Sequence, residues 1–274
     1  MSGTPPGYVH GRSEREAGRL HDQAAGLGSL LHAGVRYPPG STVLVAGCGV
    51  GAQTLLLARN SPNAFFVATD ISGESLALAE ERVRNAGHVN VAFREADILS
   101  LPFPPGSFDH TFVCFTLEHI RHRPAALACI RRVLRDGGTI TIIEGDHGTA
   151  VFHPDTAAAH HVIGCLEEVQ RRAGGNARIG REIEHLLAAA GFTGISVQPI
   201  PVYASASIPG SAEAVRAIFI AMVEGVRDRA IGEGLTDPVR WDEGIRALTR
   251  TTEPGGMFCY TFFRAVAEKG GSGL

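Results

Sequence analysis

The stretch Thr42–Gly51, TVLVAGCGVG, decides which fold this sequence predicts. Its first half, Thr42–Ala46, is a short apolar run of the kind that forms a buried strand. Glycine then occupies every second position, and glycine permits a tight turn in which a ligand can touch the backbone. The helix expected next would point its free amide groups at that ligand. The stretch therefore predicts a strand–turn–helix unit with a ligand site at the turn.

Strands and helices alternate from this turn onward. We expect further strands at Phe65–Thr69, Val89–Arg94, Phe108–Phe115 and Thr139–Glu144, and helices at Gln53–Arg59, Glu74–Asn85 and Arg123–Leu134. Such alternation predicts an α/β fold with a parallel, doubly wound sheet and right-handed crossovers. Ligands of these sheets bind beyond the carboxyl ends of the strands, where the strand order reverses.

The chain outside this core is less regular. A Pro/Gly-rich arm with Tyr8 comes first, and Ser13–Glu16 fits a capping box for a helix ending near Gly34. After residue 147 we expect helices at Thr156–Ala173, Arg181–Ala190, Ala212–Ile231 and Val239–Thr249, and strands at Ile195–Pro201 and Met257–Val266. This divides the chain into an N-terminal arm and lid helix (1–40), a ligand-binding core (41–147), cap insertions with the sixth strand (148–256), a final strand (257–267) and a tail (268–274).

Composition excludes several classes of protein. The net charge of the 274 residues is −3 and no lysine/arginine run exceeds two residues, which argues against nucleic-acid binding. No apolar run approaches the roughly 18 residues that span a bilayer, and the N-terminus lacks the apolar core of a secretory signal. The five cysteines form no CxxC pair, which is typical of reduced thiols. We therefore expect a cytoplasmic protein that acts neither on nucleic acid nor on membranes.

An acid marks the end of the second predicted strand. Asp70 follows Gly49 by 21 residues, and a carboxylate there can accept two hydrogen bonds from a ribose diol. This fingerprint is ambiguous by itself, because Gly47, Gly49 and Ala52 also satisfy the dinucleotide pattern G-x-G-x-x-G/A. A nicotinamide or flavin site therefore stays open, as does a glycine-rich turn without a ligand.

Four later segments follow this fingerprint in order: Arg94–Ile98 (READI), Leu101–Phe103 (LPF), Ser107–Asp109 (SFD) and Arg132–Gly138 (RVLRDGG). With them, residues 40–145 resemble the class I S-adenosylmethionine-dependent methyltransferases, particularly the branch with the ubiquinone/menaquinone methyltransferases. The resemblance implies a Rossmann-like, seven-stranded sheet and S-adenosylmethionine as the cofactor. Val45 is a departure, because the family commonly has an acid there that contacts the cofactor amino group.

The resemblance also assigns cofactor-binding roles. Gly47, Gly49 and Gly51 would lie under the methionine part of the cofactor, and Asp70 would hold the ribose hydroxyls. Ile71 would pack on the adenine ring, Asp97 would accept from the adenine amino group, Ile98 would supply a backbone amide, and Phe115 would lie near the methionine end. For Ile71 and Phe115, a purely structural role in the core is an equal alternative.

Two polar clusters follow the fourth and fifth predicted strands, Glu118-His119 and Glu144–His147. Both should lie over the transferred methyl group. We expect His147 to act as a general base, because an imidazole titrates near neutral pH; the alternative is a loop histidine bonded to backbone. Glu118 and His119 are further catalytic candidates, although Glu118 could instead cap the next helix. The histidines that follow lack the tight spacing of a metal site, so we expect no metal.

The cap insertions should cover the cofactor with aromatic side chains. Candidate lining residues are Phe152, Tyr203, Phe219, Met222, Trp241 and Tyr260, each with core packing as the alternative. The segments Gly7–Gly11, Glu144–Gly148, Phe152–Pro154 and Phe258–Phe263 resemble the C-methyltransferases of indole alkaloid biosynthesis, of the teleocidin and physostigmine type. That resemblance implies that Tyr8 covers the site, and such arms can be exchanged between the subunits of a homo-oligomer.

These observations together predict an enzyme of secondary metabolism that transfers a methyl group from S-adenosylmethionine to a small molecule. C-methylation of an aromatic, indole-like precursor is the expected reaction. O- or N-methylation of a quinone, phenol or amine is the first alternative, and a nicotinamide-dependent oxidoreductase is the second. A cofactor-binding regulatory or scaffold protein without turnover is the alternative outside enzymes.

Overall fold

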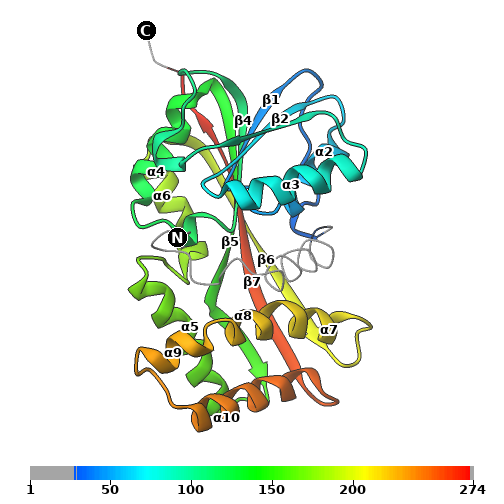
Figure 1. Ribbon diagram of the computed structural model, residues 1–274, viewed down its shortest axis with the longest axis vertical. Helices are drawn as coiled ribbons and strands as arrows, with labels where there is room; N and C mark the ends of the chain where they lie inside the picture. Colours follow the sequence, from blue (N-terminus) through cyan, green and yellow to red (C-terminus); the bar gives the residue numbers. More distant parts are fainter. Residues whose placement is uncertain (1–27, 29, 272–274) are drawn as a thin grey trace.

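The computed structural model describes residue 28 and residues 30–271, which form a seven-stranded sheet flanked by helices (Figure 1). The strand order is β3-β2-β1-β4-β5-β7-β6. Strands β1 to β5 pair in parallel, whereas β7 runs antiparallel to both β5 and β6. The doubly wound, Rossmann-like sheet of seven strands is therefore confirmed. The parallel arrangement expected for the core is found in β1 to β5, and β7 inserts antiparallel between β5 and β6.

The first half of the chain forms the part of the fold in which strands and helices alternate. Its elements are β1 (Thr42–Ala46), α2 (Ala52–Asn60), β2 (Phe65–Asp70), α3 (Gly73–Asn85), β3 (Val91–Glu95), η1 (Ile98–Ser100), β4 (Phe108–Cys114), η2 (Leu117–His119) and α4 (Arg123–Val133). The bounds of each strand and α-helix lie within two residues of those expected. The two short 3₁₀ helices are not predicted by the sequence.

The second half supplies long strands and the cap. Its elements are β5 (Leu134–His153), α5 (Ala157–Arg172), η3 (Ile179–Glu182), α6 (Ile183–Ala189), β6 (Phe192–Ser205), α7 (Ser211–Val215), the π-helical turn η4 (Arg216–Ile220), α8 (Ala221–Glu224), α9 (Arg227–Gly232), α10 (Pro238–Thr249), η5 (Arg250–Thr252) and β7 (Met257–Lys269).

Alternate residues of β1 face opposite sides of the sheet. Val43 and Val45 join the apolar cluster under α2 and α3, whereas Leu44 and Ala46 join the cluster under α4 and α6. Figure 1 shows these two helix pairs on opposite sides of the upper sheet. The central strands are thus buried on both faces, as a doubly wound sheet requires.

The strands β5, β6 and β7 are longer than expected. β5 continues from Glu144 to His153, and β7 extends to Lys269, into the expected tail. In Figure 1 the lower parts of these strands carry α5 and α7 to α10 around them. One apolar cluster runs from the α2/α3 side through Phe152, Leu166 and Trp241, so the core and the cap share a continuous interior.

A single helix over Ala212–Ile231 is wrong. The segment is divided into α7, the π-helical turn η4, α8 and α9, and Gly225 and Val226 separate the last two. A π-helical turn adds a residue to the helix and rotates the side chains that follow it. Here the turn contains Phe219, whose ring lies 4.6 Å from that of Phe258 on β7.

The expected N-terminal features are described only in part. Tyr8 and the Ser13–Glu16 capping box lie outside the described residues. The chain enters the described region as the end of a helix at Leu31, and His32, Val35 and Tyr37 then become buried. Among the helices of residues 30–271, none combines the length and apolar character needed to cross a lipid bilayer.

Candidate active site

The turn after β1 has the backbone geometry that glycine adopts most readily. Gly47, Gly49 and Gly51 have φ values of 74°, 51° and 77°. The amides of Gly47 and Cys48 both donate to Thr69 O, at 2.8 and 2.9 Å, and tie the turn to the end of β2. A Cβ atom at Gly49 would meet nothing within 4 Å, so open space faces this residue. A ligand can therefore approach the backbone here, as the sequence predicts.

Asp70 ends β2 directly beside this turn. Its Oδ2 accepts from the Gly49 amide at 2.8 Å, and its Oδ1 accepts from the Ser72 amide at 3.0 Å. A carboxylate oxygen can accept a second hydrogen bond, so Asp70 keeps room for two hydroxyl donors. Ile71 is 51% exposed and is not a core residue. It presents an apolar surface next to Asp70, where a flat ring could pack.

Asp97 lies along the same edge of the sheet. β3 pairs with β2 so that Glu95 stands opposite Asp70, and Asp97 follows two residues later. Its Oδ1 accepts from the Leu99 amide at 2.8 Å and caps η1. Ile98 is buried in the apolar cluster under α4. The two acids predicted to bind the cofactor therefore end neighbouring strands.

Val45, which stands where the family commonly has an acid, is 2% exposed and packs in the α2/α3 cluster. In the β1–β2 and β1–β4 registers its neighbours are Ala68 and Phe112, both fully buried. An ionised carboxylate would be unfavourable among these side chains. The surroundings of Val45 thus match its apolar character.

The chain turns sharply after β4, where Phe115 has φ 51°, a left-handed conformation uncommon outside glycine. Glu144 on β5 stabilises this turn, because its Oε1 accepts from the amides of Thr116 at 3.0 Å and Leu117 at 2.7 Å. Burial, and then the charge of Glu118, raise the pKa of Glu144 well above its usual value. Residues with a strained backbone, such as Phe115, cluster at functional sites.

Glu118 and His119 lie in η2, just beyond that turn, with side chains 14% and 13% exposed. Glu118 does not cap the next helix, because His122 occupies the N-cap of α4. Instead, its Oε2 accepts from Gln170 Nε2 of the cap helix α5 at 2.7 Å, and its Oε1 lies 3.6 Å from His119 Nε2. Glu118 therefore connects the end of β4 with the cap.

His147 lies in a bulge of β5 and not in a loop. The β5–β7 pairing shifts between Asp146, opposite Thr261, and Val151, opposite Cys259, so four residues of β5 face Tyr260 alone. The His147 amide donates to Ala177 O at 2.9 Å, and its Nδ1 lies 2.8 Å from the Tyr260 hydroxyl. Bulges re-aim side chains in this way near active sites.

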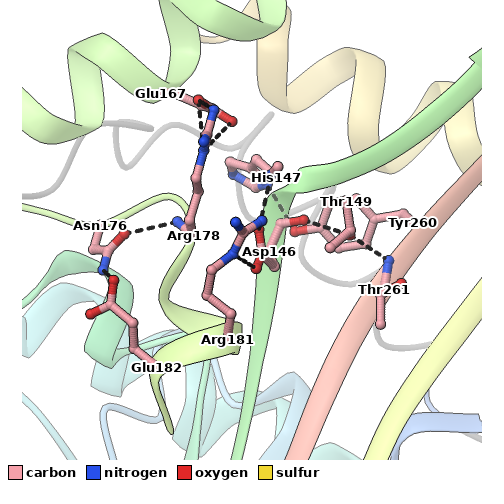
Figure 2. A network of polar contacts seen from close by, with 11 residues as sticks. Asp146, His147, Thr149, Glu167, Asn176, Arg178, Arg181, Glu182, Tyr260 and Thr261 are labelled. Carbon is pink, nitrogen blue, oxygen red and sulfur yellow. Dashed lines mark hydrogen bonds and ion pairs between the residues drawn. The ribbon is translucent and has the colours of Figure 1, made fainter. Parts of the chain in front are cut away.

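The base of the bulge is fastened by an ion pair between buried Asp146 and half-exposed Arg181, shown in Figure 2. Asp146 is fully buried, and Arg181 contacts both of its oxygens, with Nε–Oδ2 at 2.5 Å and Nη2–Oδ1 at 2.9 Å. The Gly148 amide also donates to Asp146 Oδ1 at 3.0 Å, and Thr149 Oγ1 accepts from the Thr261 amide at 3.0 Å. These contacts hold His147 in a fixed position.

A row of aromatic rings connects the turn after β4 with the cap. Phe115 lies 5.6 Å from Phe262, and Phe262 lies 4.8 Å from Tyr260. Tyr260 lies 5.5 Å from Phe219 of the cap, which also meets the His147 ring edge-on at 6.0 Å. These spacings are typical of favourable aromatic pairs. The row therefore extends from the expected methionine end of the cofactor to His147.

Other candidates fall outside this arrangement. Tyr203 is 53% exposed, and it pairs with Cys259, so it faces the side of the sheet opposite Tyr260. Trp241 and Phe152 are buried core residues of the cap. His160 contacts Asp155, and His161 contacts Thr236. Within residues 30–271, no group of three or more His, Cys, Asp or Glu side chains is placed to hold a metal ion.

Residues 43–138 match the family model described as a methyltransferase domain. The match runs from β1 to the first residues of β5, and this region carries Asp70 and Asp97.

Curated relatives match between about a third and two thirds of this chain. An uncharacterized 37.1 kDa protein in transposon TN4556 of Streptomyces fradiae is 32% identical over 185 residues, 65% of this chain and 51% of that protein. A demethylmenaquinone methyltransferase of Thermus thermophilus is 34% identical over 102 residues, 37% of this chain and 46% of that enzyme. The chain thus spans about half the length of these relatives.

Solved structures share the fold. The geranyl diphosphate C-methyltransferase of Streptomyces coelicolor superposes with a TM-score of 0.54 at 16% identity, over 90% of this chain and 78% of that chain. The Rossmann-like fold of class I methyltransferases therefore extends over nearly the whole chain, as the sequence predicts.

Proposed function

We propose that this protein is an S-adenosylmethionine-dependent methyltransferase that acts on a small molecule. The observation that carries the proposal is the meeting of the Gly49 backbone and the Asp70 carboxylate at the carboxyl ends of β1 and β2. The match of residues 43–138 to a methyltransferase domain supports it.

The chain offers a place for each part of the cofactor. The glycine turn leaves backbone open to the methionine part, and Asp70 has acceptor capacity for two ribose hydroxyls. The exposed side chain of Ile71 suits the adenine ring, and half-buried Asp97, at the same edge of the sheet, suits the adenine amino group. The bound cofactor supplies an electrophilic methyl group on a sulfonium. In this proposal Phe115, Glu118, His119 and His147 would border the acceptor, and the arm with Tyr8 remains a candidate cover.

Within this reaction class, we propose C-methylation of an aromatic natural-product precursor, with an indole-like ring system as the first choice. The row from Phe115 to Phe219 supports a planar substrate, because it makes the wall of this part of the site aromatic and apolar. In C-methylation the nucleophilic carbon bonds to the methyl group, the carbon–sulfur electrons stay with sulfur, and the carbon then loses its proton to solvent water, which restores the conjugated ring. O- or N-methylation of a quinone, phenol or amine is the alternative.

Calorimetric titration with S-adenosylmethionine and S-adenosylhomocysteine tests the proposal. Wild type should bind both, and Asp70→Ala should bind about 100-fold or more weakly, because two hydrogen bonds to a charged acceptor are lost. Asp228→Ala is the control, since Asp228 is 97% exposed and remote in sequence from the site; its affinity should equal that of wild type. Failure of wild type to bind either compound, or binding of NADH in their place, contradicts the proposal.

A further inference from the structure

Two buried polar side chains on the cap side, His147 and Tyr260, contact each other. Both side chains are 5% exposed, and His147 Nδ1 lies 2.8 Å from the Tyr260 hydroxyl (Figure 2). The hydroxyl is pressed against Gly145, where an added Cβ would overlap it. The other ring nitrogen, His147 Nε2, is buried and has no hydrogen-bond partner among the described residues.

Two arrangements of protons are compatible with this contact. If Tyr260 donates to Nδ1, the ring proton sits on Nε2, and one group, Nε2–H, is left without a partner. If Nδ1–H donates to the Tyr260 oxygen, both the hydroxyl proton and the Nε2 lone pair are left without partners. Each unsatisfied buried polar group is costly, so the first arrangement is favoured.

The charge state of the pair agrees with that arrangement. Burial lowers the pKa of His147, and this outweighs the opposite effect of nearby acids, Glu118 first among them. Burial also raises the pKa of Tyr260 well above its usual value. At neutral pH the pair is therefore a phenol beside a neutral imidazole, and the phenol keeps the proton that it donates.

The surroundings of His147 connect its unpaired Nε2–H group with the candidate active site. His147 meets Phe219 edge-on, and the aromatic row from Phe115 ends at this point. The Asn176 amide donates to Glu118 O at 2.8 Å, and the next residue, Ala177, accepts from the His147 amide at 2.9 Å, so the pair lies near the turn after β4. A planar molecule on the aromatic row would thus bring its edge to a buried N–H group.

We propose that His147 is a neutral hydrogen-bond donor which binds an oxygen atom of the substrate through Nε2–H, and that Tyr260 is the positioning residue that fixes this tautomer. The inference rests on the proposed methyl transfer and narrows its substrate class. The acceptor would carry a carbonyl, enolate or phenolate oxygen conjugated with the carbon that is methylated.

This assignment separates His147 from the role of a base. The contact moves no proton, since His147 keeps its Nε2 proton before and after methyl transfer. An oxygen that accepts this hydrogen bond stays in the plane of the conjugated ring, and the nucleophilic carbon is held at a fixed distance from it. An indole or amine N–H cannot occupy the same place, because it would face another donor. An indole-like substrate must therefore present a carbonyl or phenolate oxygen to His147.

Nitrogen NMR of the full chain, labelled at histidine nitrogen and free of ligands, tests the tautomer. The His147 signals are those missing from His147→Gln. In wild type we expect the proton on Nε2, and in Tyr260→Phe we expect a shift toward a mixture of tautomers. A wild-type proton on Nδ1, or a spectrum unchanged by Tyr260→Phe, overturns the assignment. Because no cofactor is present, this result is independent of the methyltransferase proposal.

Binding of matched bicyclic probes tests the substrate class. The probes are 1-indanone, which has a carbonyl oxygen, indane, which lacks it, and indole, which has an N–H donor, each with S-adenosylhomocysteine present. From wild type to His147→Leu, 1-indanone should lose about 3- to 10-fold in affinity, the effect of one neutral hydrogen bond, and indane should be unchanged. His147→Gln retains an N–H donor and should lose less. Equal losses for indane and 1-indanone, or a loss confined to indole, overturn the proposal.

Discussion

The two sides of the candidate active site are built in different ways. The cofactor side uses the backbone of Gly47–Gly51 and short acids at the ends of adjacent strands, Asp70 and Asp97. The cap side uses side chains that are far apart in sequence, His147, Phe219 and Tyr260, and it brings them together with a β-bulge and a π-helical turn. One side depends on local conformation, and the other depends on long-range packing.

This difference indicates where each kind of chemistry is specified. Local backbone geometry can hold a cofactor whose shape does not change from one reaction to the next. Substrate contacts need polar atoms at particular places in an apolar interior. Such atoms must be held in place by other contacts, such as the ion pair of buried Asp146 with half-exposed Arg181. Substitutions on the two sides should therefore fail for different physical reasons.

The largest effect is expected on the cap side, at the ion pair beneath the bulge. Arg181→Ala leaves the fully buried Asp146 carboxylate without its partner and should lower the free energy of unfolding by about 3–5 kcal/mol. Urea unfolding measures this. Asp146→Asn is the matched variant, and it should cost less because no buried charge is left. Equal losses for the two would contradict a buried charge as the cause.

A smaller loss is expected from the glycine turn, and two glycines separate stability from binding. In Gly51→Ala the new Cβ lies 2.8 Å from Ala79 Cα of α3 in a left-handed conformation, so unfolding should become easier by about 2–4 kcal/mol.

Gly49→Ala is its counterpart, because nothing lies within 4 Å of the added Cβ and only the backbone term of roughly 1–2 kcal/mol applies. The added methyl group should instead weaken S-adenosylhomocysteine binding. Calorimetry and urea unfolding of both variants measure the two effects. Unchanged affinity in Gly49→Ala would remove this residue from the cofactor site.

Acid should destabilise the protein through a buried histidine on the α2 side. Burial lowers the pKa of His32 from 6.5 to about 4, so the unfolded chain binds the proton more readily than the folded one. The contribution of His32 to the free energy of unfolding is therefore fully present above pH 6.5, and it is lost as the pH drops toward 4. From pH 7 to pH 5 this single group should remove about 2 kcal/mol. Urea unfolding of wild type and His32→Leu at both pH values measures it; an equal pH dependence of the two proteins would contradict it.

The smallest effect is expected for the conservative change Glu144→Gln, although Glu144 holds the turn after β4. Burial and Glu118 raise the pKa of Glu144 and favour its neutral form, and Glu144→Gln keeps a neutral acceptor for the amides of Thr116 and Leu117. Its stability should change by less than about 1 kcal/mol. Glu144→Leu removes the acceptor and should cost about 2–4 kcal/mol in urea unfolding, because two buried amides lose their partner. A large loss in Glu144→Gln would show that the charge itself is needed.

The sequence predicts the backbone geometry of the glycine turn and its position beside Asp70 well, because the signals are local. The apolar run before Gly47, the glycine spacing and Asp70 lie within 30 residues, and the structure joins Gly49 to Asp70 directly. The alternation of strands and helices up to Arg123–Val133 is also correct within two residues.

The cap side is poorly predicted because its contacts are remote. Gly145–Thr149 is glycine-rich and polar, which favours a loop, yet β5 runs through it as a bulge, because β5 pairs with β7 on both sides of the segment. Tyr260 lies 113 residues from His147, and no local pattern pairs them. The alternation of apolar residues in Phe258–Phe262 is the one signal that could have placed Tyr260 on the inner face of its strand.

A crystal structure with bound S-adenosylhomocysteine tests the central claim most directly, because it locates the cofactor between the two sides. We expect the ribose hydroxyls on the Asp70 carboxylate, the adenine ring against Ile71, and the sulfur atom facing Phe115 and the His147–Tyr260 pair. A sulfur atom that points away from this pair, or a ligand bound elsewhere than at Asp70, would contradict the account.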